Sequence, residues 1–226
     1  MLLLIAKIEK HEALDCIDEI IDVADGVMVA RGDLGIEIPL EQVPVMQKMI
    51  TKKASIKGKS VITATQMLES MIENIFPTRA EITDVANAVL DGTDSIMTSG
   101  ETSSGKFPVE SIETMAKIAK ENEKYLSPEI IEPFQLDDMR INVAIANAAY
   151  EMLVQLNEIN KIIVYTRTGV TARIISRLNL PVKIYALVAS QNIKRQLDLT
   201  KSVWPYVLNK YWIDRDQAIK DMVKFG

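Results

Sequence analysis

Four apolar runs in the first half of the sequence each end in side chains that can do chemistry. In order along the chain, these ends are Lys7 with Glu9, Arg31-Gly32-Asp33, Thr65-Gln66, and Ser99-Gly100-Glu101. Ligands of parallel α/β folds bind beyond the carboxyl ends of the strands, so polar groups at four successive ends predict one shared site. The alternative is that these are ordinary turn residues, because turns favour the same residue types.

Lys7 and Glu9 are two positions apart, so strand alternation places both side chains on one face. A cation and a carboxylate are costly to bury on an apolar strand. That cost favours a functional pair, although a structural ion pair or exposure beyond the strand end also explains it. Asp33 lies between Gly32 and Gly35, which let the backbone approach a ligand closely, or it is a plain helix N-cap. Because Mg²⁺ usually takes one or two carboxylates, Glu9 and Asp33 together indicate a candidate metal site.

The other polar positions support two interpretations each. Thr65 could orient a substrate or a water, and Ser99 with Glu101 could relay a proton. A strand terminus and a simple turn account for the same residues. In the second half, Thr166-Arg167-Thr168-Gly169 lies between a predicted strand and a predicted helix. That setting suits a phosphate group, and it equally suits a capped helix start.

Composition excludes several classes of protein. The 226 residues are 48% hydrophobic and carry a net charge of -5, so the chain is globular and neither nucleic acid nor an anionic membrane is an expected partner. With one histidine and one cysteine, a zinc site and a His-based nucleophilic triad are disfavoured. No apolar run approaches the roughly 20 residues of a membrane-spanning helix. A lone cysteine fits a reducing compartment, and we expect a cytoplasmic protein.

The elements that must position these groups alternate between strands and helices. In the first half, apolar runs predict strands at 2–8, 26–30, 60–64 and 95–98, and helical periodicity predicts helices near 13–21, 41–56, 79–90 and 109–124. Such serial βα organisation implies a parallel sheet with crossover helices. Residues 126–137 carry two prolines without clear periodicity, which indicates a linker. Beyond it, we expect helices at 138–156, 170–178, 193–199 and 214–224, and strands at 161–166, 182–188 and 203–208.

The sequence closely resembles the pyruvate kinase family in several of its motifs. The matching motifs come in the family's order: residues 2–14 (LLLIAKIEKHEAL), 27–39 (VMVARGDLGIEIP), 64–71 (ATQMLESM), 77–81 (PTRAE), 84–92 (DVANAVLDG) and 99–102 (SGET). Several long motifs in order are far more specific than any single one. The resemblance is dense to about residue 124 and looser through residue 208, where residues 165–169 (YTRTG) are similar to the family's C-terminal domain.

For the fold, the resemblance implies a partial TIM barrel of about four βα units at residues 1–125. After the linker, it implies an α/β C-terminal domain at residues 138–226, with a small, mostly parallel sheet. The family's earlier barrel strands and its lid domain have no counterpart here, and the last strands of the C-terminal domain are missing. We therefore expect the chain to hold the second half of the enzyme.

For the chemistry, the resemblance implies phosphoryl transfer from phosphoenolpyruvate to ADP, which yields pyruvate and ATP. Lys7 would bind the substrate and stabilise charge on the phosphoryl group and the enolate. Glu9 and Asp33 would hold Mg²⁺ or Mn²⁺. The backbone of Gly32 and Asp33 would receive the substrate carboxylate, and Arg31 belongs to the same substrate-binding set.

The resemblance also implies roles for residues at the third and fourth strand ends and in the second half of the chain. Thr65 would lie near the carbon that is protonated, and Ser99 and Glu101 would support the proton relay. Residues 166–169 (Thr166, Arg167, Thr168 and Gly169) would form an incomplete effector-phosphate site. The family's K⁺ site and most of its nucleotide contacts belong to the missing half. Phosphoryl transfer depends on positioning and on cationic stabilisation of oxygen charge, which agrees with the residues found.

Half a barrel leaves strand edges unpaired, which favours association. We therefore expect a homo-oligomer, a tetramer in the family, or a complementary N-terminal half as partner, and little activity from the chain alone. Two alternatives remain open at this stage. One is a Mg²⁺-dependent lyase or aldolase that forms an enolate, and the other is a non-catalytic oligomerisation module.

Overall fold

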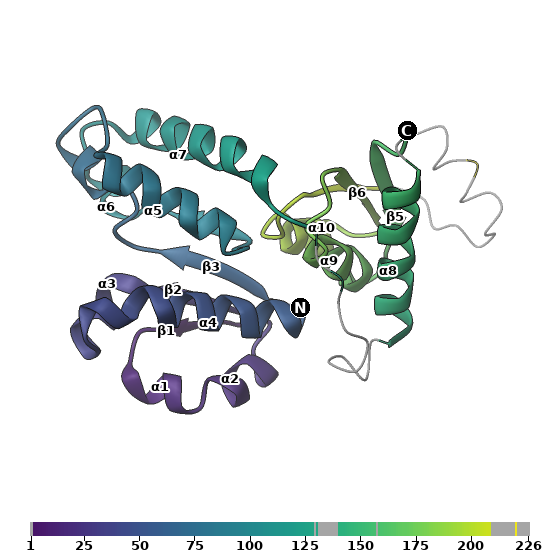
Figure 1. Ribbon diagram of the computed structural model, residues 1–226, viewed down its shortest axis with the longest axis horizontal. Coiled ribbons are helices and arrows are strands. Elements are labelled where there is room, and N and C mark those ends of the chain that lie inside the picture. Colours follow the sequence, from purple (N-terminus) through teal and green to yellow (C-terminus); the bar gives the residue numbers. More distant parts are fainter. Residues whose placement is uncertain (1, 129, 131–139, 157, 209–219, 221–226) are drawn as a thin grey trace. The chain divides into compact units, whose positions relative to one another are not determined.

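A computed structural model describes residues 2–128, 130, 140–156, 158–208 and 220 (Figure 1). The chain divides into two compact units, residues 2–127 and residues 128–226. Each unit is built on its own sheet of parallel strands with helices between them. The predicted fold class, a partial barrel followed by an α/β domain, is confirmed.

The first unit contains a four-stranded parallel sheet in the order β1-β2-β3-β4. Its strands are β1 (Ile5–Ile8), β2 (Gly26–Ala30), β3 (Ser60–Ala64) and β4 (Ser95–Met97). Its α-helices are α1 (His11–Asp15), α2 (Ile17–Val23), α3 (Arg31–Glu37), α4 (Val43–Ile56), α5 (Arg79–Leu90), α6 (Gly100–Ser103) and α7 (Pro108–Asn122). Short 3-10 helices lie at η1 (Leu40–Gln42), η2 (Glu69–Ile72) and η3 (Glu123–Tyr125). The sequence order is therefore also the spatial order, as serial βα units require.

Two sequence predictions need correction here. The strand expected at 2–8 begins only at Ile5, which is paired with Gly26. Before that point the Asp25 N–H still donates to the Leu4 carbonyl at 2.9 Å, but the Leu4 N–H donates to the Asp25 carboxylate at 2.8 Å and not to a strand carbonyl. The regular ladder therefore ends there. The helix expected near 13–21 is two short helices, because the backbone leaves the helical region at Cys16 (φ -117°, ψ 27°).

Helices α2 and α4 bury one face of this sheet. Apolar side chains that alternate along the strands meet apolar side chains of the two helices in one cluster. Its fully buried members are Ile8, Ile17, Ile21, Val27, Val29, Ile50, Ala54 and Val61. Each large aliphatic side chain removed from water contributes about 1.5–3 kcal/mol. Packing of this kind fixes the strand register and thereby the position of the strand ends.

A hydrogen-bond network fixes the start of α5. The Thr78 side chain accepts from the Glu81 N–H, and the Glu81 carboxylate accepts from the Thr78 N–H, which together form a capping box. The same carboxylate accepts from the Ser70 N–H at 2.7 Å and from the Ser70 hydroxyl at 2.6 Å. Partial burial acts to raise the pKa of Glu81, but these hydrogen bonds outweigh it, and the net effect lowers the pKa.

We expect Glu81→Gln to reduce amide protection along α5 at neutral pH, by an amount equivalent to about 1 kcal/mol. A carboxyl whose pKa is lowered on folding stabilises the fold above its unfolded value, about 4.3, and loses that contribution as the pH falls through the folded value. The difference between Glu81→Gln and the parent should therefore shrink below about pH 4. Hydrogen exchange of the α5 amides measures this locally. Glu110→Gln, in the first turn of α7, is the matched control. An equal loss of α5 amide protection in this variant would contradict the role given to the Ser70 and Thr78 bonds.

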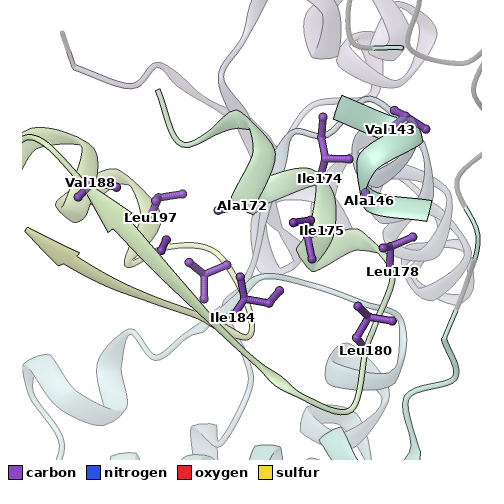
Figure 2. Close-up of a cluster of buried hydrophobic side chains, with 12 residues drawn as sticks. Val143, Ala146, Ala172, Ile174, Ile175, Leu178, Leu180, Ile184, Val188 and Leu197 are labelled. Atoms are coloured by element: carbon purple, nitrogen blue, oxygen red, sulfur yellow. The ribbon is translucent and has the colours of Figure 1, made fainter. Parts of the chain in front are cut away.

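The second unit has a three-stranded parallel sheet in the order β5-β6-β7. Its strands are β5 (Lys161–Tyr165), β6 (Lys183–Val188) and β7 (Val203–Val207), and its helices are α8 (Arg140–Gln155), α9 (Val170–Arg177) and α10 (Gln191–Leu197). Figure 2 shows side chains of its core, which come from α8 (Val143), α9 (Ile174) and β6 (Ile184) among others. The helix expected at 214–224 and most of the expected 126–137 linker lie outside the described residues. Within the described residues, none of the helices has the length and apolarity needed to cross a membrane.

Candidate active site

The carboxyl ends of β1 to β4 carry the polar groups that the sequence singled out. The strands are parallel and in register, with Ile8 opposite Val29 and Ala30 opposite Ala64. Lys7 lies near the end of β1, and Asp33 lies in the first turn of α3, which follows β2 directly. Thr65 is the first residue after β3. The sheet therefore brings the ends of separate sequence segments to one edge.

Lys7, Glu9 and Asp33 meet at that edge. The Lys7 ammonium donates to the Glu9 carboxylate and, at 2.9 Å, to Asp33 Oδ2. All three side chains are partly open to solvent, with exposed fractions of 50% for Lys7, 36% for Glu9 and 51% for Asp33. Two carboxylates from different strand ends therefore already share one cation, and both still reach solvent.

These contacts favour the charged forms of Lys7 and Asp33. The hydrogen bond to Glu9, followed by the one to Asp33, raises the pKa of Lys7 from its ordinary value. The hydrogen bond from Lys7 lowers the pKa of Asp33. At neutral pH the ammonium is charged and the Asp33 carboxylate is ionised, which is the state that a metal ion or a phosphoryl group would meet.

The turn after β3 holds the Thr65 hydroxyl against the start of α3. Thr65 Oγ1 accepts from the Gly32 N–H at 2.7 Å and donates to the Ala64 carbonyl at 2.6 Å. Thr65 and Gln66 both have left-handed backbones, with φ values of 67° and 52°. Non-glycine residues rarely adopt this conformation, because each one costs about 1–3 kcal/mol that the surrounding contacts must offset.

Arg31 points into the protein. It is 7% exposed, and its guanidinium donates to the Thr65 carbonyl at 2.7 Å and to Asp84 Oδ1 at 2.6 Å. It also donates to the Gln66 carbonyl and to Gln47. The sequence placed Arg31 among the groups that bind substrate directly. Its geometry instead gives it protein partners in the turn after β3, on α4 and on α5.

Glu101 is also buried, at 2% exposed. One of its carboxylate oxygens accepts from the Leu68 N–H at 3.1 Å and the other accepts from the Ser99 N–H at 2.7 Å. The carboxylate therefore joins the loops that follow β3 and β4. Ser99, expected to act with Glu101 in a proton relay, is held through its backbone.

Sequence reasoning gave no role to Asp84 or Gln47, the two side-chain oxygen acceptors of Arg31. Both lie on amphipathic helices, where a polar residue looks like part of a solvated face. Asp84 opens one of the motifs that resemble the family, residues 84–92, and that was the available signal. Nothing in the local pattern marks Gln47, which is buried at 5% exposed.

His11, Glu12 and Glu37 form a second set of polar side chains, called the His11 group below. His11, to which the sequence gave no role, lies 3.3 Å from Glu12 Oε2 and 3.4 Å from Glu37 Oε2, and all three residues are exposed. A cavity of about 500 Å³ lies between α4 and α5, and Arg31 and Asp84 are part of its wall. Lys7, Glu9 and Asp33 are not among its lining residues. The chemistry at the strand ends is thus on an open surface and not in this cavity.

The loop Thr166–Gly169 belongs to the second unit. The Thr166 hydroxyl accepts from the Gly169 N–H at 3.0 Å, and Gly169 precedes α9 with a φ of 83°. Thr166 is buried, whereas Arg167 and Thr168 are exposed. The loop is thus closed by its own first side chain, and Arg167 remains on the surface as the group that could meet an anion.

Comparison with known proteins gives one consistent family. Residues 1–112 match the pyruvate kinase barrel domain and residues 143–226 match the pyruvate kinase alpha/beta domain. The chain is 44% identical over 212 residues to a pyruvate kinase of Clostridium acetobutylicum, an alignment that covers 91% of this chain and 44% of the relative. It is 46% identical over 206 residues to a pyruvate kinase of Thermotoga maritima, with the same two shares.

A solved structure agrees with these relatives. The crystal structure of a pyruvate kinase from Cryptosporidium parvum matches with a TM-score of 0.86 and 40% identity, over 99% of this chain and 46% of the other. The chain thus spans less than half the length of the relatives it matches. Both parts of the sequence match domains of the same enzyme in the same order, so this chain belongs to the pyruvate kinase family.

Proposed function

We propose that this chain provides part of the active site for phosphoryl transfer between phosphoenolpyruvate and ADP, with pyruvate and ATP as products. The observation that carries the proposal is the meeting of Lys7, Glu9 and Asp33 at the edge where the parallel strands end. In phosphoryl transfer the protein mainly positions the reactants and neutralises oxygen charge. A lysine beside two carboxylates supplies groups for both tasks.

Glu9 and Asp33 would hold a divalent cation, Mg²⁺ or Mn²⁺. The donor set fits, because two hard carboxylate oxygens converge on one positive charge, the Lys7 ammonium. When bound, the metal ion would neutralise developing oxygen charge and help to orient the substrate. The family's K⁺ site would lie in its N-terminal half, outside the part of the family that this chain matches.

The chain's own residues would perform the other steps. Lys7 would donate to the phosphoryl oxygens and to the oxygen on which enolate charge develops. The backbone around Gly32 and Asp33, at the start of α3, would receive the substrate carboxylate; in the free protein the Gly32 N–H is bonded to Thr65 Oγ1. Thr65, whose hydroxyl lies at the Gly32 N–H, would stand beside the carbon that takes up a proton, and Ser99 would complete that side of the site.

The same proposal extends to partners. Among the described residues, β1 and β4 each have one strand neighbour, so the sheet offers two edges. Exposed edge strands favour pairing with strands of another chain, and we propose a complementary N-terminal half or further copies of this chain as the partner. The exposed Arg167 beside Thr168 is the proposed contact for an effector phosphate. A cytoplasmic location fits a glycolytic role.

A coupled assay for pyruvate formation from phosphoenolpyruvate and ADP tests the proposed function. We expect activity when the chain is supplied with a complementary N-terminal half, and little without it. Aldol cleavage in place of phosphoryl transfer would support the lyase alternative. If neither activity is found with the partner half bound, only a role in oligomerisation remains.

A further inference from the structure

We infer that Arg31 and Glu101 are positioning residues that hold the turn Thr65–Leu68 from its two sides. Neither would touch the substrate; both would act through Thr65. The structural part of this inference stands on the contacts alone. Its kinetic part rests on the function proposed above.

Arg31 holds the first half of the turn. Its Nε and Nη2 atoms donate to the Thr65 carbonyl at 3.2 and 2.7 Å, and Nη2 also donates to the Gln66 carbonyl at 3.1 Å. Nη2 lies 2.8 Å from the Met67 sulfur, which is fully buried. A planar guanidinium with donors in a fixed fork thus fixes two successive carbonyls, whereas a lysine ammonium has no fixed fork and sits on a flexible stem.

Glu101 holds the second half of the turn. Its carboxylate accepts from the Leu68 N–H at 3.1 Å, and its other oxygen accepts from the Ser99 N–H at 2.7 Å. The carboxylate is buried, and a buried charge without hydrogen bonds is strongly disfavoured. Both of its oxygens are instead used to fasten backbone, so the loop after β3 is tied to the loop after β4.

Backbone strain explains why the turn must be held from both sides by Arg31 and Glu101, called its clamps below. Thr65 and Gln66 are consecutive non-glycine residues with left-handed φ values. Such residues persist where the surroundings over-determine them. The strained turn is what places Thr65 Oγ1 at 2.7 Å from the Gly32 nitrogen. Loss of a clamp would let the turn relax and would move the hydroxyl away from α3.

A purely structural role for Arg31 is the competing explanation. Its ion pair with Asp84 would then matter most, since Nη1 lies 2.6 Å from the Asp84 carboxylate. This explanation predicts that any buried cation would serve, and that loss of the Asp84 charge would do the same damage as loss of the guanidinium. If Arg31 holds the turn, we expect the opposite on both points, because four of the Arg31 contacts go to residues 65–67.

Amide hydrogen exchange on the full chain separates the two explanations without any need for activity. Arg31→Lys keeps the charge and lacks the fork, so we expect the Gly32 amide to exchange about five- to ten-fold faster. Glu101→Gln should do the same at either Leu68 or Ser99, because one of the two accepting oxygens becomes an amide nitrogen. Asp84→Asn, which keeps an oxygen for Nη1, is the matched control and should leave Gly32 unchanged. The Val29 amide of β2 is the internal reference in every variant.

The outcomes are assigned as follows. Faster exchange at Gly32 in Arg31→Lys with Val29 unchanged supports the clamp. Equal acceleration at Val29, or an equal response to Asp84→Asn, overturns it, because Arg31 would then act on the fold as a whole. Unchanged exchange at Gly32 in Arg31→Lys overturns it too.

Kinetics of the active enzyme then test the functional part. A displaced Thr65 hydroxyl should lower kcat by about 10- to 100-fold with a much smaller change in KM, since a misplacement of about 1 Å is sufficient for such a loss. Arg31→Lys should not rescue kcat, and Asp84→Asn should stay close to the parent. If the exchange responds while the parent, with the complementary half bound, forms no pyruvate, the proposed function fails and the clamp stands. If the parent is active and kcat does not change in Arg31→Lys, the functional part of the clamp fails and the proposed function stands.

Discussion

Lys7→Met is expected to lower the rate of pyruvate formation by about 1000-fold or more, because a single cation directed at a transferring phosphoryl group contributes effects of this size. Methionine has a similar length and removes only the charge and its donors. The Lys7 ammonium is held by Glu9 and Asp33 and lies at the strand ends. The coupled assay in the presence of the complementary half measures the loss, and circular dichroism checks that the fold is kept.

Lys10→Met is the matched control for this prediction. Lys10 is an exposed lysine three residues further along, and its ammonium lies 3.8 Å from the Glu37 carboxylate. It faces the His11 group and not Asp33, so we expect its removal to change the rate by no more than about two-fold, as for most surface pairs. Equal losses in both variants would show that net positive charge, and not the position of Lys7, is what the reaction needs.

Much of this arrangement could be predicted from the sequence because it depends on strong, local patterns. The runs 26–30 and 60–64 are nearly all apolar or small, and both are strands with those bounds. Parallel strands end at one edge, so the convergence of Lys7 and Asp33 follows once the βα order is known. The motifs that resemble the family added the identity of the chemistry, which no periodicity contains.

The parts that the sequence did not predict depend on which way a side chain turns. Arg31 and Asp33 are two residues apart in the same motif, yet Arg31 is buried beneath the turn after β3 and Asp33 is exposed beside Lys7. A helix begins at Arg31, so its side chains point in different directions around the axis and the two residues separate. Glu101 was similarly expected to face the reaction. Its burial results from two backbone N–H groups that require an acceptor, a need that only the folded loops create.

Asp33→Asn is expected to weaken Mn²⁺ binding at the strand ends by at least about ten-fold, whereas Lys7→Met is expected to strengthen it. The first change removes the charge of one of two candidate ligands. The second removes the ammonium that the structure places between the same carboxylates, so that a divalent cation no longer competes with it. Titration of Mn²⁺ into the full chain, followed by electron paramagnetic resonance, measures both changes.

Glu37→Gln is the control that separates this site from the His11 group, since Glu37 is an exposed carboxylate with its own cationic neighbours. If Glu37→Gln abolished Mn²⁺ binding and Asp33→Asn did not, the ion would belong to His11, Glu12 and Glu37, and the proposed metal ligands would be wrong. The two effects of Lys7→Met carry the stronger argument, because they have opposite signs. A variant that binds the metal ion more tightly and forms pyruvate far more slowly has lost a group that competes with the metal in the resting protein and that stabilises charge in the reaction. A lysine that served only as a structural counterion for Glu9 and Asp33 would show the first effect without the second.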